Sequence, residues 1–152
     1  MTTTVAPPTV PGYVNWFVTR LLRSPLHRVM SGNTMLLTVT GRKSGRRYVV
    51  VVRYVRVGAV VTCFTDSKWW INLRGGAPVE MLIGGRTVSG IATAVEDRAL
   101  VVAGLSEFLH VTPGDSKYYG VRRDADGSPN LDDIRGAGEY ATMIRIEDAA
   151  AR

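Results

Sequence analysis

Residues 34–65 read TMLLTVTGRKSGRRYVVVVRYVRVGAVVTCFT, and this stretch decides the fold. Thr34–Thr40 has the pattern of a buried strand, and Gly41–Arg46 is a polar turn. Tyr48–Val57 is rich in valine and tyrosine, and a glycine separates it from Ala59–Thr65. Short β-prone runs separated by turn residues predict antiparallel hairpins.

The next residues continue the β pattern after one helical turn. A short helix is predicted over Lys68–Arg74, capped by Asp66 or Ser67 and ended by two glycines. Pro78–Ile83 and Arg86–Val95 flank Gly84-Gly85, which predicts a second hairpin.

Helices are predicted on both sides of this β-rich region. Apolar residues at helical spacing between Val14 and Leu22 predict a first helix that ends near Pro25. Asp97 is expected to cap another helix, with an apolar stripe formed by Val101, Leu105, Phe108 and Leu109. Residues 113–135 are rich in Gly, Asp and Pro and are expected to form a connector ordered only in part. A closing strand is expected over Glu139–Ile146.

This element order predicts a mainly β protein. Five or six short antiparallel strands with two or three helices suggest a small barrel, because closing a sheet removes its exposed edges. The length of 152 residues suits one domain, which we expect over residues 13–152 after a flexible Thr/Pro-rich segment at residues 1–12. No secretory signal or membrane span is recognised, and the single cysteine excludes an internal disulfide, so a cytoplasmic location is expected.

Charge is distributed unevenly along the chain. The whole chain carries 19 basic and 13 acidic residues, and the first acidic residue is Asp66, after nine basic ones. Such a basic front half attracts anions: nucleic acid, an anionic membrane or a phosphorylated small molecule. A solvated basic surface with no ligand is the alternative.

The turn after the first strand is the first candidate site. Its glycines allow the backbone N–H groups to turn inward, while Arg42, Lys43 and Ser44 supply charge and a hydroxyl before Gly45. Arg46 and Arg47 extend the positive field, and arginine suits phosphate. The order of residues is not that of a Walker A loop. Alternatively, the turn is a basic hairpin tip in solvent.

A second candidate site is the segment Ser67–Arg74, SKWWINLR. A helix N-terminus favours anions, and two adjacent tryptophans point to different sides of a helix. Trp69 or Trp70 could therefore stack on a planar ligand, or one could be buried and the other lie at a dimer contact.

Together, TVTGRKSG and WWINLRGGAPVEMLIGGRTVSGIA resemble the deazaflavin-dependent nitroreductase and quinone reductase family over about residues 30–100. The resemblance implies a split β-barrel (antiparallel, Greek-key-like, similar to flavin reductases and pyridoxamine oxidases), often dimeric. It implies coenzyme F420, an 8-hydroxy-5-deazaflavin with an anionic tail, as cofactor, and hydride transfer to a quinone, nitro compound or conjugated enone as activity. The cofactor-binding residues that it implies are Arg42, Lys43, Ser44, Gly45, Arg47, Thr65, Ser67, Lys68, Trp69 and Asn72.

The chain departs from the family pattern at three places, one of which is Gly75–Pro78, where Gly-Gly-Ala-Pro stands in place of the usual Asn-Pro after the helix. The segment before the first tryptophan is only Thr65–Lys68, shorter than in many members. On the strand after the basic turn, Val51 and Arg53 replace the usual Pro and Tyr. The shorter segment is expected to reshape the pocket for the cofactor ring.

No catalytic constellation is evident, which suits a protein whose cofactor performs the chemistry. His27 and His110 are expected to be structural, Cys63 a buried inert thiol, and no metal site is predicted. Tyr118 and Tyr119 could form a mobile lid over a small apolar substrate, or be incidental aromatics in an exposed loop.

Three alternatives stay open at this point. The first helix could cover the barrel or rest on the inner face of a membrane, with Trp16 and Phe17 beside arginines. The same barrel could be a non-enzymatic binder of a lipid or another apolar ligand. A nucleic-acid binder is the weakest reading, because no base-reading motif accompanies the charge.

Overall fold

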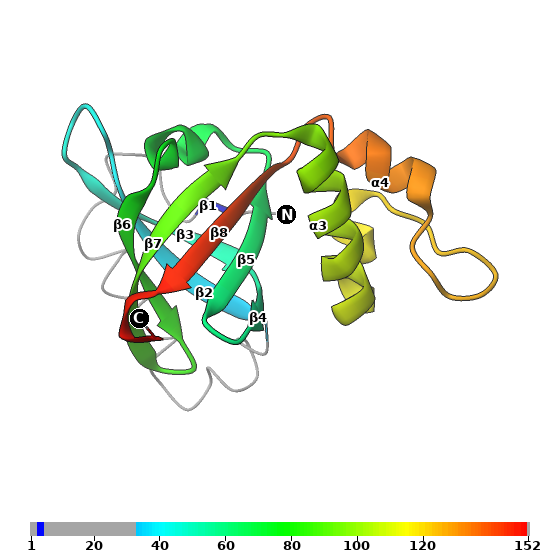
Figure 1. Cartoon of the computed structure of the whole chain (residues 1–152), viewed down its shortest axis with the longest axis horizontal. Helices are drawn as coiled ribbons and strands as arrows, with labels where there is room; N and C mark the ends of the chain where they lie inside the picture. The colour runs from blue at the N-terminus through cyan, green and yellow to red at the C-terminus, as the bar shows by residue number, and fades with distance from the viewer. Residues whose placement is uncertain (1–2, 5–32, 152) are drawn as a thin grey trace.

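The computed structural model describes residues 3–4 and 33–151. In this part of the chain, eight antiparallel strands form one sheet in the order β1-β3-β2-β6-β7-β8-β5-β4. The strands are β1 (Thr3–Thr4), β2 (Thr34–Thr40), β3 (Arg47–Arg53), β4 (Val55–Val57), β5 (Val60–Thr65), β6 (Ala77–Ile83), β7 (Arg86–Val95) and β8 (Thr142–Asp148). The predicted mainly β, antiparallel barrel is confirmed (Figure 1).

The sheet curls because one bent run of residues supplies β4 at one end of the strand order and β3 next to the other end. The run that the sequence predicted as a single strand breaks at Tyr54 into β3 and β4. β3 pairs with β2, whereas β4 pairs with β5 at the opposite end of the strand order. The Tyr54 N–H donates to the carbonyl of Asn33, 2.8 Å away, which extends the β2–β3 register by one residue before the chain turns to pair with β5. A strand shared in this way brings the two ends of the sheet together.

The second predicted hairpin is confirmed. β6 and β7 pair from Ala77–Ala92 to Ile83–Arg86, with only Gly84 and Gly85 between them. Both glycines have positive φ, 56° and 82°, as a two-residue turn of the primed type requires.

Helical segments connect the strands. They are η1 (Lys68–Leu73, 3-10), α3 (Arg98–Val111), η2 (Pro113–Tyr119, 3-10), α4 (Leu131–Ala137) and η3 (Ala149–Ala151, 3-10). The predicted cap of α3 is confirmed, because Asp97 Oδ1 accepts from the Leu100 N–H at 3.1 Å. Figure 1 shows α3 and α4 on one side of the barrel, beside β5 and β8.

Three local predictions are corrected. The helix after Thr65 is a 3-10 helix, and it has no side-chain cap, since the Ser67 N–H instead donates to Thr65 Oγ1. The connector over 113–135 contains η2 and α4, and an unpredicted cap at Asn130 starts α4 by accepting from the Asp133 N–H. The closing strand begins at Thr142 rather than Glu139.

Alternation along the strands separates the two larger of three hydrophobic clusters among the described residues, an inner core and an outer core; the third is formed by Leu36, Val49 and Leu82. Ile144 and Ile146 on β8 point into the barrel, whereas Met143 points outward to α3. On β5, Cys63 points inward and Phe64 outward in the same way. The outer core holds all four residues of the predicted α3 stripe: Val101, Leu105, Phe108 and Leu109. The helices therefore cover one outer face of the barrel.

The predicted first helix, its proposed membrane contact and His27 lie outside the described residues. In the part of the chain that is described, no helix is long and apolar enough to cross a membrane.

Candidate functional site

The basic turn is a closed, hydrogen-bonded loop at one end of the barrel. The Gly41 N–H donates to the Arg46 carbonyl at 2.8 Å, and the Gly45 N–H donates to the Gly41 carbonyl at 3.0 Å. Gly45 has φ 69°, a conformation that glycine adopts without strain. Ser44 Oγ accepts from the Arg46 N–H at 3.2 Å, which leaves its own hydroxyl hydrogen available. The loop thus presents its side chains from a fixed backbone.

The structure brings the two candidate segments into contact through Asn72. Asn72 Oδ1 accepts from the Arg42 N–H at 2.9 Å, and Asn72 Nδ2 donates to the Trp69 carbonyl at 3.0 Å. Asn72 Nδ2 also donates to the hydroxyl of Tyr48. Arg42 Nη1 donates to the Ile71 carbonyl at 3.3 Å. Residues about thirty positions apart in the sequence therefore form one surface, the β2–β3 loop on η1 (Figure 1).

The two tryptophans have different environments, as helical spacing predicted. Trp69 is buried in the barrel core, and its Nε1 has no hydrogen-bond acceptor among the described residues. Trp70 is half-buried, and the guanidinium of Arg74 lies 4.8 Å from its ring centroid. A buried N–H without an acceptor costs free energy, so the Trp69 indole is suited to meet an acceptor that a ligand supplies.

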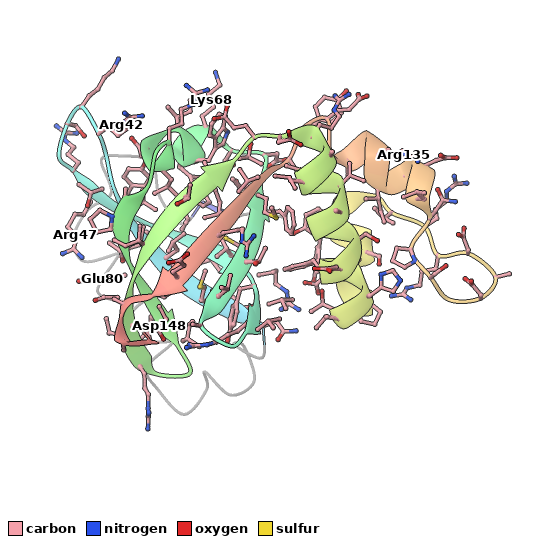
Figure 2. All side chains as sticks on the ribbon, viewed as in Figure 1. Arg42, Arg47, Lys68, Glu80, Arg135 and Asp148 are labelled. Carbon is pink, nitrogen blue, oxygen red and sulfur yellow. The ribbon has the colours of Figure 1, made fainter. Side chains whose placement is uncertain are left out.

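Positive charge gathers on this surface. Lys43, Arg46 and Lys68 have exposed side chains that form no ion pair or hydrogen bond with any described residue. Arg47 differs, because its Nη2 lies 2.8 Å from Glu80 Oε2 on β6. Figure 2 shows Arg42 and Lys68 at one end of the barrel and Asp148 toward the other. These three cations, unpaired among the described residues, give this surface a positive potential that attracts anions.

A pocket opens where β5 ends, just before η1. Its volume is about 360 Å³, and its walls come from the end of β5, the end of η2 and the connection between α4 and β8. The lining residues are Thr65, Asp66, Tyr118, Tyr119, Gly120, Ala137, Tyr140 and Ala141. Because Ser67 and Lys68 follow Asp66 directly, the pocket and the cationic surface are continuous along the chain.

Tyr119 is part of the outer core and also of the pocket wall. Its ring packs edge-on against Phe64 and Phe108, with centroids 6.3 and 6.1 Å away. Its hydroxyl is buried without a hydrogen-bond partner among the described residues, and burial raises its pKa. The hydroxyl therefore stays protonated at neutral pH. Tyr118 is exposed. Tyr119 is thus a packed residue rather than an incidental aromatic of an exposed loop.

A larger groove of about 900 Å³ lies elsewhere, between α3 and strands β4, β5 and β8. It contains none of the residues predicted from the two motifs. The remaining sequence candidates are structural: Cys63 is buried, with its pKa raised to about 12 by desolvation, and His110 Nδ1 lies 2.7 Å from the Ser106 carbonyl. No group of metal-binding side chains is found among the described residues.

Comparison with known proteins identifies the family. The family model described as F420H(2)-dependent quinone reductase matches residues 15–106, well over half of the chain. The chain belongs to this family. The resemblance read from the two motifs is confirmed, and coenzyme F420 is the cofactor that membership indicates. No curated protein sequence matches the chain.

Solved structures confirm the split-barrel fold. A protein from Listeria innocua described as a candidate pyridoxamine 5′-phosphate oxidase is 13% identical, with TM-score 0.50 over 87% of this chain and 94% of that one. An FAD-binding protein from Mesorhizobium loti is 18% identical, with TM-score 0.50 over 82% and 89%. A protein of unknown function from Agrobacterium tumefaciens is 14% identical, with TM-score 0.51 over 97% and 63%.

The residues present match what the family's cofactor requires. An anionic tail needs cations without partners, and Lys43, Arg46 and Lys68 are such cations in the described chain. A flat ring with polar edges needs a pocket and donors, and the buried Trp69 N–H and Tyr119 O–H lack partners there. Nothing in the comparisons favours the alternative of a lipid binder.

Sequence reasoning missed Tyr48, Asp115 and Tyr140. The hydroxyl of Tyr48 accepts a hydrogen bond from Asn72 Nδ2. Asp115 forms an ion pair with Arg53, and Tyr140 lines the pocket. Only Arg53 carried a signal in the sequence, as a departure from the family pattern, and nothing local indicated its partner.

Proposed function

We propose that this protein is an F420H2-dependent reductase that transfers a hydride to a quinone, nitro compound or conjugated enone. The observation that carries the proposal is the contact of the β2–β3 loop with η1 through Asn72, which assembles both family motifs into one surface. Reduced F420, when bound, supplies the hydride. The protein then has to bind the cofactor, orient the acceptor substrate beside it and exclude water from the site.

In this proposal the cationic surface holds the anionic part of the cofactor. Lys43, Ser44 and Arg46 bind phosphate from the loop, with Lys68 on the other side. Arg42 and Asn72 are engaged with each other and position the loop, while Arg47 is held by Glu80. Ser67 and Thr65 border the pocket, and the Trp69 N–H donates to the cofactor.

The acceptor substrate is proposed to enter the 360 Å³ pocket. Reduction of a quinone needs a proton as well as a hydride at the developing oxyanion. The Tyr119 hydroxyl donates a hydrogen bond there, the proton that completes the reduction comes from solvent, and the exposed Tyr118 covers the substrate.

Titration with oxidised and reduced F420, followed by tryptophan fluorescence quenching, tests the proposal. Lys43→Ala should weaken binding about 10-fold, because a charge-assisted contact to phosphate is lost. Arg135→Ala is the matched control, since Arg135 is an exposed cation on α4, away from the loop (Figure 2). Absence of binding by the unaltered protein at about 100 μM F420, an affinity too weak for a resident cofactor, would contradict the proposal.

We further propose a cytoplasmic protein with one barrel domain that forms a homodimer. Two observations support the dimer. One similar structure, 16% identical with TM-score 0.53, is described as a domain-swapped dimer, and Val57, Leu100 and Val111 are exposed around the α3 groove. Light scattering after size exclusion, expected to give twice the monomer mass of 16.6 kDa, tests this.

A further inference from the structure

Arg53 and Asp115 form an ion pair that lies outside the two sequence motifs. Arg53 ends β3, and Asp115 lies in the first turn of η2, 62 residues later. The pair is bidentate, with Nε 3.0 Å from Oδ2 and Nη2 2.8 Å from Oδ1. Arg53 Nη1 also donates to Thr34 Oγ1 at 2.9 Å, which fixes the guanidinium on the β2–β3 ladder.

The carboxylate of this pair is shielded from solvent, and its guanidinium is partly exposed. The Asp115 side chain is 4% exposed and that of Arg53 32%. Removing one partner of such a pair leaves a buried charge uncompensated, so the pair constrains geometry more strongly than surface pairs do. The pair joins a barrel strand to a segment that otherwise packs on α3.

The segment held by this pair forms one wall of the pocket. η2 ends in Tyr118 and Tyr119, which face Thr65 and Asp66 at the end of β5. The N-terminal turn of η2 is fixed by Asp115, and only three residues separate Asp115 from Tyr119. A shift of that turn would therefore move the tyrosine wall relative to the barrel wall.

We propose that the Arg53–Asp115 ion pair sets the width of the substrate pocket, so that both are positioning residues that determine which acceptors the protein accepts. The inference rests on the proposed function for its substrate and deepens it. The cationic surface for F420 lies on the β2–β3 loop and η1 and does not include either residue.

The test uses the full chain with Asp115→Asn, which keeps the side-chain shape and removes the charge. Asp148→Asn is the matched control: Asp148 pairs with Arg56 at 2.6 Å with similar exposure, 8% and 36%, toward the other end of the barrel from Lys68 (Figure 2). If Asp115→Asn fails to fold, Arg53→Lys, which keeps the charge and loses the bidentate contact, takes its place.

The first readout is amide hydrogen exchange without cofactor. Asp115→Asn should speed exchange over residues 113–121 about 10-fold or more, with the β2, β3 and β6 amides unchanged. Asp148→Asn should leave the amide exchange rates of residues 113–121 unchanged. Unchanged exchange over 113–121 in Asp115→Asn would overturn the inference.

The second readout separates the substrate from the cofactor. With a benzoquinone and a bulkier naphthoquinone as acceptors, Asp115→Asn should change the ratio of their kcat/KM values about 10-fold, mainly through KM, with F420 affinity unchanged. An unchanged ratio, or an equal loss of F420 affinity, would overturn the inference. If the unaltered protein binds no F420, the proposed function fails, and hydrogen exchange still decides whether the pair holds η2.

Discussion

The side-chain amide of Asn72 is fully engaged by protein groups, although the family motif indicates a cofactor-binding residue at this position. Both N–H bonds of its amide are used, by Tyr48 and the Trp69 carbonyl, and its oxygen accepts from Arg42. The sequence motif indicated a cofactor-binding residue, and the geometry supports the proposal of a positioning residue. Its function is then to hold the loop at a fixed distance from η1.

Replacement of Asn72 tests this positioning role. Asn72→Ala removes the contacts between loop and helix, so we expect F420 affinity to fall about 10-fold and unfolding free energy to fall by about 1–3 kcal/mol. Tyr48→Phe loses only one of the contacts and should have a smaller effect on both. Fluorescence titration and urea unfolding measure the two quantities. Full F420 affinity in Asn72→Ala would contradict the role.

Cys63 is expected to be chemically inert in the native protein. Burial raises the pKa of its thiol to about 12, so almost no thiolate is present at pH 8. A disulfide reagent such as DTNB should therefore label the native protein at a small fraction of its rate with the urea-unfolded protein. The unfolded chain is the control, because it contains the same single cysteine. Equal labelling rates for the two forms would show that the thiol is accessible.

At the scale of elements, hairpins and the cap of α3 could be predicted because their signals are local. Gly84-Gly85 and Asp97 act on their immediate neighbours. The segments η2 and α4 were missed because they are short and polar, with few buried residues to create a period. Even so, Asn130 three residues before Asp133 is a cap signal that the sequence does contain.

At Gly90 on β7, the close approach of β8 leaves no room for a side chain. A Cβ at this position of β7 would lie 2.7 Å from the Glu147 carbonyl oxygen and 2.8 Å from Ile146 Cγ2 on β8. Because the β8 backbone cannot shift without disturbing its pairing with β7, Gly90→Ala should destabilise the fold by about 1–3 kcal/mol. Gly136→Ala is the control, because a Cβ there has no neighbour within 4 Å and alanine favours the helix α4. Urea unfolding measures the stability of both variants. Equal unfolding midpoints for Gly90→Ala and the unaltered protein would contradict the prediction.

At the scale of the whole molecule, barrel closure and the pocket could not be predicted residue by residue. Closure depends on the bend at Tyr54, where the chain passes from pairing with β2 to pairing with β5, and a continuous run of β-prone residues gives no sign of this bend. The pocket combines three segments around residues 65, 119 and 140. Such juxtapositions depend on tertiary packing, whereas the two family motifs indicated the fold and the anion-binding end because each is contiguous.

Buried thiol and phenol groups should make the stability of the whole fold fall at high pH. Folding raises the pKa of Cys63 to about 12 and also raises that of Tyr119, both chiefly through desolvation. Between the unfolded pKa of a cysteine, about 8.5, and the folded value, the native state binds more protons than the unfolded chain. Stability is therefore fully present below about pH 8.5 and is lost as pH rises toward 12.

The slope of this loss identifies the group responsible. For one cysteine, unfolding free energy should fall by up to about 1.4 kcal/mol per pH unit above pH 9. Cys63→Ala lacks the thiol, so its slope between pH 9 and 10.5 should be smaller, even though its stability at pH 7 is lower because a buried atom is removed. Urea unfolding at several pH values measures both slopes. Parallel slopes in the two proteins would mean that Cys63 ionisation is not linked to unfolding.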